Sequence, residues 1–248
     1  MTKQLVVMEP HQILDSTHDL SLAEIRVLQL TLASIWRDQR DEGIGVEYKM
    51  YSLTLSDYSE VFGLSPEGTY GDIVDTVKSL MQRILVLKTK LIEPTANDRS
   101  KTVVHWVDKA VYDPIASTIA IRFDSELIQI LNGLGKENLY SQYELENTSG
   151  MSSVLSIRLF RLLNKWKKAK RTSFEVEEFR RLMGVVAGTY TSVADLRNKV
   201  INRAIKEINT KTVLKVRVEV EKRGKKIDRF RFIIIEGKFK GWGRDRDE

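Results

Sequence analysis

Arginine, asparagine and lysine side chains are concentrated in one stretch of the chain, DLRNKVINRAIKEIN at residues 195–209. Arg and Asn can each form two parallel hydrogen bonds with the major-groove edges of guanine and adenine, whereas Lys neutralises phosphates. The stretch therefore predicts DNA recognition by a single polypeptide element. The expected base-reading residues are Arg197, Asn198, Asn202 and Arg203. The expected phosphate-binding residues of this stretch are Lys199 and Lys206.

Two further groups of basic residues lie outside this stretch. The sequence KRGKK predicts a turn at Gly224 that could reach a neighbouring phosphate or the minor groove. Its expected phosphate-binding residues are Lys222, Arg223, Lys225 and Lys226. A third group comprises Lys165, Lys167, Lys168, Lys170 and Arg171. A solvated surface explains this third group as well as DNA binding does.

Charge is divided unevenly along the chain. Residues 151–248 contain 26 Lys and Arg against 12 Asp and Glu, a net charge of +14. Residues 1–150 contain 14 Lys and Arg against 22 Asp and Glu, a net charge of −8. The whole-chain net charge of +6 and the pI near 9.3 therefore come from the C-terminal part. Because positive charge favours binding to phosphates, we expect this part to bind DNA more strongly than the acidic part.

A short pattern that occurs twice predicts how the basic residues are positioned. SLTLSDYSEVFGL at residues 52–64 aligns without a gap with SFEVEEFRRLMGV at residues 173–185, and nine of the thirteen columns keep their chemical class. Upstream, IRVLQL matches IRLFRL. Downstream, residues 69–83 match residues 189–203, with Arg83 opposite Arg203. Such self-similarity predicts two copies of one small domain.

Each copy is expected to begin with helix, strand and helix. In the N-terminal copy, Ser21 and Glu24 form a capping box before an amphipathic helix. A short strand follows, with its apolar residues at positions 53 and 55 or 174 and 176. The next helix ends at Gly63 or Gly184, where a left-handed C-cap favours glycine.

A longer helix and a β-hairpin complete each copy. The helix is expected to begin near Asp72 or Ser192, and the hairpins are expected within residues 102–124 and 213–237. The apolar side of the second long helix is expected to comprise Val193, Leu196, Val200, Ala204, Ile205 and Ile208. This order of elements is that of a winged helix-turn-helix. We therefore predict an α+β protein with two tandem winged helix-turn-helix domains related by internal duplication, at residues 1–150 and 151–248.

Few residues suit catalysis, metal binding or a cofactor. The chain has no cysteine, and its histidines, His11, His18 and His105, lack a metal-ligand spacing. GLGKEN at residues 133–138 lacks the spacing and the ending of a phosphate-binding loop. Neither an eighteen-residue apolar run nor a signal peptide is present. We expect a cytoplasmic protein without enzymatic activity, metal, cofactor or membrane segment.

Four sequence blocks in order carry a family resemblance. They are SIRLFRLLNKW, FEVEEFRRLMGV, DLRNKVINRAIKEINTKT and the KRGKKI hairpin, and SLAEIRVLQLTLASI supports them in the first copy. With these blocks the chain resembles the iteron-binding plasmid replication initiators, which consist of two winged-helix domains. Leu155 and Val213 depart from the family pattern, at positions where relatives usually carry an aromatic and an acidic residue.

The resemblance implies a function in which the chain itself catalyses nothing. Family members bind direct repeats, called iterons, in a plasmid origin as monomers. They help to open the duplex, and they recruit the host initiator ATPase and the replicative helicase. As homodimers they commonly repress their own promoter through an inverted repeat. Double-stranded DNA is therefore the expected ligand.

The two copies are expected to have different roles on DNA. Two recognition helices on one chain can enter successive major grooves about 10.5 bp apart, so one monomer should cover roughly 20 bp. The C-terminal copy is expected to be the principal reader. The N-terminal copy is expected to be a phosphate clamp and a dimer surface. Its expected phosphate-binding residues are Lys78, Arg83, Lys88 and Lys90.

Three alternative functions are left open by the sequence. A dedicated winged-helix transcriptional repressor would bind a palindrome instead of direct repeats. A nicking initiator of the rolling-circle type would cut supercoiled plasmid in the presence of a divalent metal. An acidic adaptor fused to a nonspecific basic domain would bind any duplex with equal affinity.

Overall fold

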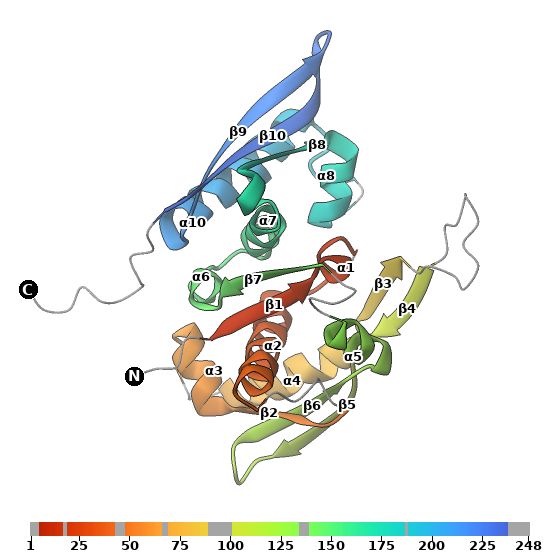
Figure 1. Ribbon diagram of the computed structural model, residues 1–248, viewed down its shortest axis with the longest axis vertical. Coiled ribbons are helices and arrows are strands. Elements are labelled where there is room, and N and C mark those ends of the chain that lie inside the picture. The colour runs from red at the N-terminus through yellow and green to blue at the C-terminus, as the bar shows by residue number, and fades with distance from the viewer. Residues whose placement is uncertain are drawn as a thin grey trace, which may run out of the picture. The chain divides into compact units, whose positions relative to one another are not determined.

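The computed structural model describes residues 5–16, 19–42, 48–65, 69–88, 101–133, 139–186 and 188–237. The chain divides into two compact units, Met1–Leu145 and Glu146–Glu248 (Figure 1). This border lies five residues before the expected border at 150/151. Within the described ranges, none of the helices has both the length and the apolar character that crossing a membrane requires.

The C-terminal unit consists of helices packed against a three-stranded antiparallel sheet. Its helical elements are α6 (Glu146–Ser149), α7 (Val154–Asn164), the 3-10 turn η1 (Lys167–Ala169), α8 (Val176–Met183), α9 (Val193–Asp195), the π-helical segment η2 (Leu196–Ile201) and α10 (Asn202–Lys211). Its strands are β8 (Arg171–Glu175), β9 (Leu214–Arg223) and β10 (Lys226–Glu236). The strand order is β8, β10, β9, so the last hairpin pairs with the strand that precedes α8.

The N-terminal unit contains the same order of elements with additions. Its helices are α1 (His11–Leu14), α2 (Leu22–Glu42), α3 (Leu55–Phe62), α4 (Thr69–Met81) and α5 (Ser125–Asn132). Its strands are β1 (Val6–Pro10), β2 (Tyr51–Thr54), β3 (Ile84–Lys88), β4 (Lys101–His105), β5 (Val107–Asp113), β6 (Thr118–Phe123) and β7 (Tyr140–Glu144). The sheet β2, β6, β5 corresponds to β8, β10, β9, while β1 pairs with β7 and β3 with β4.

The two units agree in detail, which confirms the predicted fold and its duplication. Helices α3 and α8 each have eight residues and are followed by a glycine in the left-handed conformation. The antiparallel registers also correspond, because Leu53 pairs with Ile119 and Phe174 pairs with Phe230. Each unit is therefore a winged helix-turn-helix.

Three helices begin earlier than predicted. Leu55 and Val176, expected as strand residues, are the first residues of α3 and α8. In α3 the reason is local, because the Thr54 hydroxyl accepts a hydrogen bond from the Asp57 backbone N–H at 2.9 Å and starts the helix one residue earlier. Helix α4 begins at Thr69, three residues before the expected Asp72.

The two long helices end at different points of the repeat. Helix α4 ends at Met81, so Arg83 follows it, whereas Arg203 lies inside α10. The two arginines are therefore not structurally equivalent. Helix α4 has 13 residues, and the continuous helix formed by α9, η2 and α10 extends from Val193 to Lys211.

A further difference concerns the strand expected at residues 102–113. It is interrupted at Trp106, which is 2% exposed. Only β5 belongs to the hairpin with β6, whereas β4 pairs with β3. The β3–β4 ribbon is an addition to the N-terminal unit, because β9 follows α10 almost directly in the C-terminal unit.

Aromatic side chains form the centre of the C-terminal core. The Phe179 ring of α8 lies 5.5 Å from the Phe230 ring and 5.6 Å from the Phe232 ring, measured between centroids. Phe174 lies 6.2 Å from Phe232. Buried aromatic pairs at these separations stabilise a core beyond their burial of apolar area. The packing fixes α8 against the sheet and thereby orients the helix-turn-helix.

Arg158 of α7 also fixes α8, at its C-terminal end. Its Nη1 donates a hydrogen bond to the Met183 carbonyl oxygen at 2.8 Å. Gly184 follows with φ +61°, and a Cβ atom at this position would lie 1.7 Å from Arg158 Nη1. Gly63 has φ +62°, but a Cβ atom there would meet nothing within 4 Å. The two equivalent glycines therefore have the same backbone requirement and different steric surroundings.

A buried carboxylate connects α2 and α4 in the N-terminal unit. Glu24 is 1% exposed, and its Oε2 accepts a hydrogen bond from the Ser21 backbone N–H at 2.6 Å. Its Oε1 accepts hydrogen bonds from Ser79 Oγ at 2.7 Å and Arg83 Nε at 2.9 Å. Burial alone would raise the pKa of Glu24, but the hydrogen bonds from Ser21, Arg83 and Ser79 outweigh it and lower the pKa. The predicted capping box is present, and it is part of this larger network.

The lowered pKa of Glu24 predicts a specific dependence of stability on pH. The stabilisation by the carboxylate is complete above its unfolded-state pKa of about 4.3 and is lost as the pH falls through the lower folded-state pKa. We expect Glu24→Gln to reduce the free energy of unfolding by about 2 kcal/mol at pH 7. This difference from the wild type should shrink below about pH 4. Urea unfolding at pH 7 and pH 3.5 measures both values, and a pH-independent difference would contradict the prediction.

Candidate nucleic-acid interface

The helix-turn-helix of the C-terminal unit comprises α8 and the continuous helix α9–η2–α10. Ser192 caps the second helix, because its Oγ accepts hydrogen bonds from the backbone N–H groups of Ala194 at 3.1 Å and Asp195 at 3.4 Å. One side of this helix is buried and comprises Leu196, Val200, Ile201, Ala204 and Ile208. We call the exposed side the polar helix face, and it comprises Asn198, Lys199, Asn202, Arg203 and Lys206. The structure thus brings five of the six predicted DNA-binding residues of this helix to one side.

The side chains of the polar helix face differ in their interactions. Asn202 Nδ2 donates a hydrogen bond to Asn198 Oδ1 at 3.3 Å, so the two amides lie one turn apart and in line. Lys199 Nζ forms an ion pair with Asp195 at 2.8 Å. The side chains of Arg203 and Lys206 make no hydrogen bond or ion pair within the described part of the chain. The face therefore presents amide, guanidinium and ammonium groups to solvent.

The π-helical segment η2 explains why the buried side differs from the predicted one. Val193 and Ile205 were expected to be buried and are only half-buried, whereas Ile201 is fully buried. A π turn contains one more residue than an α turn, so consecutive residues, Val200 and Ile201, both pack inward. Arg197 lies in the same segment, partly buried, and its Nε has no hydrogen-bond partner in the described residues. It is therefore not on the polar helix face.

Arg180 holds the turn between the two helices, a role that sequence reasoning missed. Its Nη2 donates hydrogen bonds to the carbonyl oxygens of Tyr190 at 2.8 Å and Thr191 at 3.3 Å. Its side chain is 15% exposed, and Tyr190 has the unusual φ of +46°. Ser59 occupies the equivalent position in the first copy, and this difference in the repeat is the signal that could have identified Arg180.

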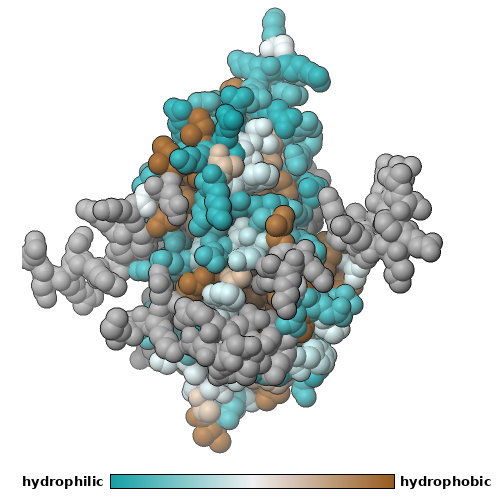
Figure 2. All heavy atoms as spheres, viewed as in Figure 1, coloured by the Kyte–Doolittle hydropathy of each residue, from teal (hydrophilic) through white to brown (hydrophobic). Residues whose placement is uncertain are grey.

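The β9–β10 hairpin presents a second basic group, which we call the wing tip. It comprises Lys222, Arg223, Lys225 and Lys226, all of which are exposed. The turn consists of Gly224 and Lys225, and Gly224 has φ +64°, as the first residue of a type II′ turn requires. Figure 1 shows the hairpin extending beyond the helices of its unit, and Figure 2 shows a hydrophilic tip.

Two acidic residues near the wing tip, Glu221 and Glu175, are paired with arginines outside it. Glu221 forms an ion pair with Arg231 at 2.5 Å, and Glu175 forms one with Arg229 at 3.1 Å. Because these carboxylates are already paired, they neutralise little of the positive charge at the wing tip. The hairpin can therefore contact phosphates with several cations at once.

The third basic group, which we call the corner cluster, lies at the other end of the same sheet. It comprises Lys165, Lys167, Lys168, Lys170 and Arg171, between α7 and the start of β8. Arg171 pairs with Ile233, seven residues along β10 from Lys226. At about 3.3 Å per residue, this separates the corner cluster from the wing tip by roughly 23 Å.

The corresponding helix of the N-terminal unit has a different surface. The exposed residues of α4 include Asp72, Asp75 and Lys78, and Lys78 forms an ion pair with Asp75 at 3.0 Å. Arg83, expected to bind phosphate, instead has its Nε on Glu24. Lys88 is the last residue of β3, but its side chain and the whole of Lys90 lie outside the described residues. The structure therefore brings no group of basic residues together on α4.

Comparison with known proteins gives matches over nearly the whole chain. Residues 6–164 match the family described as "Initiator Replication protein, WH1", and residues 175–234 match "Initiator Rep protein, WH2". A replication initiation protein of Escherichia coli is 22% identical over 236 residues, which cover 93% of this chain and 70% of the relative. An uncharacterized 27.6 kDa protein of Escherichia coli is also 22% identical, over 95% of this chain and 96% of the relative.

A solved structure shows the same fold. The Pi initiator protein, determined in complex with iteron DNA, superimposes with a TM-score of 0.78 at 20% sequence identity. The match covers 96% of this chain and 100% of that one. The chain also matches both domain descriptions of the family in the right order. The chain is a member of the initiator replication protein family, and its two winged-helix units are the WH1 and WH2 domains of that family.

Proposed function

We propose that this chain is a sequence-specific DNA-binding initiator of plasmid replication that binds direct repeats at an origin. The observation that carries the proposal is the polar helix face, which presents Asn198, Asn202 and Arg203 to solvent on the second helix of a helix-turn-helix. Family membership and the iteron DNA bound by the Pi initiator protein support it. The charge of the C-terminal part supplies the attraction to phosphates.

The proposed mode of binding follows from general rules for this motif. The polar helix face enters the major groove, where the amides and the guanidinium form hydrogen bonds with base edges. Lys199, Lys206 and the wing tip contact phosphates on either side. The Nε of Arg197 has no hydrogen-bond partner in the described residues. On DNA its guanidinium turns toward the major groove and contacts a base edge.

The N-terminal unit has a supporting part in this proposal. Lys78, Lys88 and Lys90 contact phosphates as a clamp, while Arg83 serves the fold through Glu24. Since Asp72 and Asp75 lie on the exposed side of α4, this unit reads few bases and contributes less affinity.

Footprinting on direct repeats beside the gene tests the proposed function, together with one substitution. We expect protection of each repeat over roughly 20 bp. Arg203→Ala should weaken binding to the repeat by about 1–3 kcal/mol and relax specificity at one base pair, because a bidentate contact to a base is lost. Binding to unrelated duplex at the same salt concentration is the control. Protection of a promoter palindrome alone would instead support a dedicated repressor.

Catalysis by other proteins completes the proposed initiation. The chain opens and marks the origin by binding, and the host initiator ATPase and replicative helicase supply ATP hydrolysis and unwinding. The chain itself acts without enzymatic activity, and the bacterial cytoplasm is the compartment in which such a function operates. A nicking assay on supercoiled plasmid with divalent metal tests this proposal, and a nicked product would contradict it.

A homodimer that represses the chain's own promoter is the second part of the proposal. Val103 and Ile84 on one face of the β3–β4 ribbon are 58% and 48% exposed, and this ribbon has no counterpart in the C-terminal unit. Such an apolar ribbon suits pairing with a second copy. Light scattering with and without repeat DNA measures the balance of monomer and dimer.

A further inference from the structure

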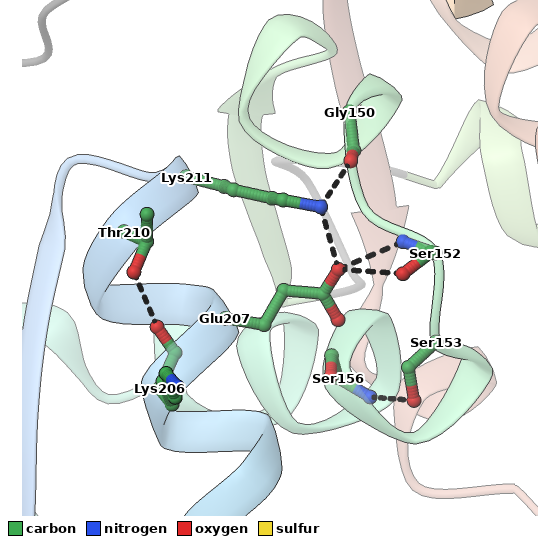
Figure 3. A network of polar contacts seen from close by, with 8 residues as sticks. All are labelled: Gly150, Ser152, Ser153, Ser156, Lys206, Glu207, Thr210 and Lys211. Carbon is green, nitrogen blue, oxygen red and sulfur yellow. Dashed lines mark hydrogen bonds and ion pairs between the residues drawn. The ribbon is translucent and has the colours of Figure 1, made fainter.

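The segment that joins the two units is bound to the proposed base-reading helix (Figure 3). Glu207 of α10 accepts hydrogen bonds on Oε1 from the Ser152 backbone N–H at 2.8 Å and from Ser152 Oγ at 3.1 Å. Lys211, one turn further along α10, donates to the same oxygen at 2.9 Å and to the Gly150 carbonyl oxygen at 2.7 Å. A carboxylate and an ammonium group of one helix thus hold residues 150–152.

The rest of this segment is packed onto the C-terminal unit as well. Asn147 Oδ1 accepts a hydrogen bond from the Val213 backbone N–H at 3.0 Å, directly before β9. Asn147, Thr148 and Met151 are all at most 2% exposed. On the other side of the border, the Leu145 backbone N–H donates to the Leu5 carbonyl oxygen at 2.8 Å within the N-terminal unit. The residues on each side of the border are therefore hydrogen-bonded to their own unit.

Electrostatics keeps this attachment in place at neutral pH. Burial alone would raise the pKa of Glu207, but the hydrogen bonds from Lys211, Ser152 and Ser156 outweigh it and lower the pKa. The side chains of Glu207 and Lys211 are 13% and 21% exposed. Asp195 and Lys199 form a pair with the same spacing on the same helix, but their side chains are 44% and 57% exposed and bind no other segment among the described residues.

We propose that Glu207 and Lys211 are positioning residues that make the protein sensitive to the spacing of its DNA site. They fix residues 150–152 to the reading helix, and the Asn147–Val213 hydrogen bond holds the start of the segment, so movement between the units is confined to the backbone torsions around Leu145–Glu146. The two DNA-binding units then accept only a narrow range of separations and rotations along the duplex. This inference rests on the proposed function, because it concerns a site that both units contact.

The test compares two variants that each remove one negative charge from the same helix. Glu207→Gln breaks the attachment, and Asp195→Asn breaks the exposed pair. Binding is measured on a repeat obtained by selection from random duplexes and on versions with one to five base pairs inserted at its centre. Each inserted base pair rotates the two halves by about 35°. We expect an insertion of two base pairs to weaken wild type and Asp195→Asn at least tenfold, and Glu207→Gln less than threefold.

Hydrogen exchange and further variants separate the possible results. Exchange of the Ser152 amide should become faster in Glu207→Gln and stay unchanged in Asp195→Asn. Lys211→Arg should keep the spacing dependence, whereas Lys211→Met should lose it.

If Glu207→Gln does not fold, Ser152→Ala weakens the attachment from the joining segment instead. If the wild-type protein shows no repeat-specific binding, the proposed function is wrong. Faster Ser152 exchange with an unchanged spacing dependence overturns this inference alone.

Discussion

Gly184→Ala is expected to destabilise the C-terminal unit by about 2–4 kcal/mol. A left-handed backbone costs alanine about 1–2 kcal/mol relative to glycine. The new methyl group would also occupy the position of the Arg158 guanidinium, 1.7 Å from Nη1, and would displace it from the Met183 carbonyl oxygen. Loss of a charged hydrogen bond adds about 1.5–3 kcal/mol, part of which the flexible arginine recovers by moving. Urea unfolding followed by hydrogen exchange reports the stability of each unit separately.

Gly63→Ala is the matched control for this substitution. It requires the same left-handed conformation, φ +62°, but the methyl group would meet no atom within 4 Å. We expect a cost of only about 1–2 kcal/mol, confined to the N-terminal unit. Equal losses in the two variants would show that Arg158 contributes nothing at Gly184.

Removal of the wing-tip charges is expected to have the largest effect on DNA binding. The variant carries alanine at Lys222, Arg223, Lys225 and Lys226. Each phosphate contact contributes about 0.9 to the slope of log affinity against log salt, so four contacts would make the slope shallower by about 3–4. Near 0.15 M salt this corresponds to a loss of roughly 100- to 1,000-fold in affinity. Fluorescence anisotropy with one repeat duplex between 0.05 and 0.3 M salt gives both quantities.

The corner cluster supplies a control with the same change of charge. Alanine at Lys165, Lys167, Lys168 and Lys170 also removes four positive charges from the C-terminal unit, but roughly 23 Å from the wing tip. If contact matters more than net charge, this variant should keep nearly the full salt slope. A wild-type salt slope in the wing-tip variant would contradict a phosphate contact by the wing tip.

The fold could be predicted from the sequence where local rules and the repeat agreed. Gly63 and Gly184 occupy the same column, and both end a helix in the left-handed conformation because only glycine does so without strain. Ser21 and Glu24 form the predicted capping box. The alternating apolar residues of β9 and β10 predicted the hairpin, although both strands extend further toward Gly224 than expected.

Tertiary context explains what could not be predicted. The π-helical segment depends on how Val200 and Ile201 pack against the rest of the unit, which helical periodicity does not register. Arg83 was expected on phosphate because its sequence neighbours do not reveal Glu24, which lies 59 residues away in the chain. Arg180 binds backbone carbonyl oxygens of a turn, so its neighbours in the sequence do not reveal this role, and only its difference from Ser59 in the repeat marks it.

The carboxylates that connect helices in the two units, the buried Glu24 and the half-buried Glu207, are attached to different helices. In the N-terminal unit Glu24 lies on α2 and binds Arg83 beyond the end of α4, whereas in the C-terminal unit Glu207 lies on α10 and binds Ser152, two residues before α7. An internally duplicated chain can misassemble by exchanging equivalent helices between its copies. Pairing α2 with α10 would bring the carboxylates of Glu24 and Glu207 together. Pairing α7 with α4 would leave Arg83 and Ser79 without a carboxylate partner. We therefore expect the different placement of these carboxylates to disfavour exchange of equivalent helices between the copies during folding.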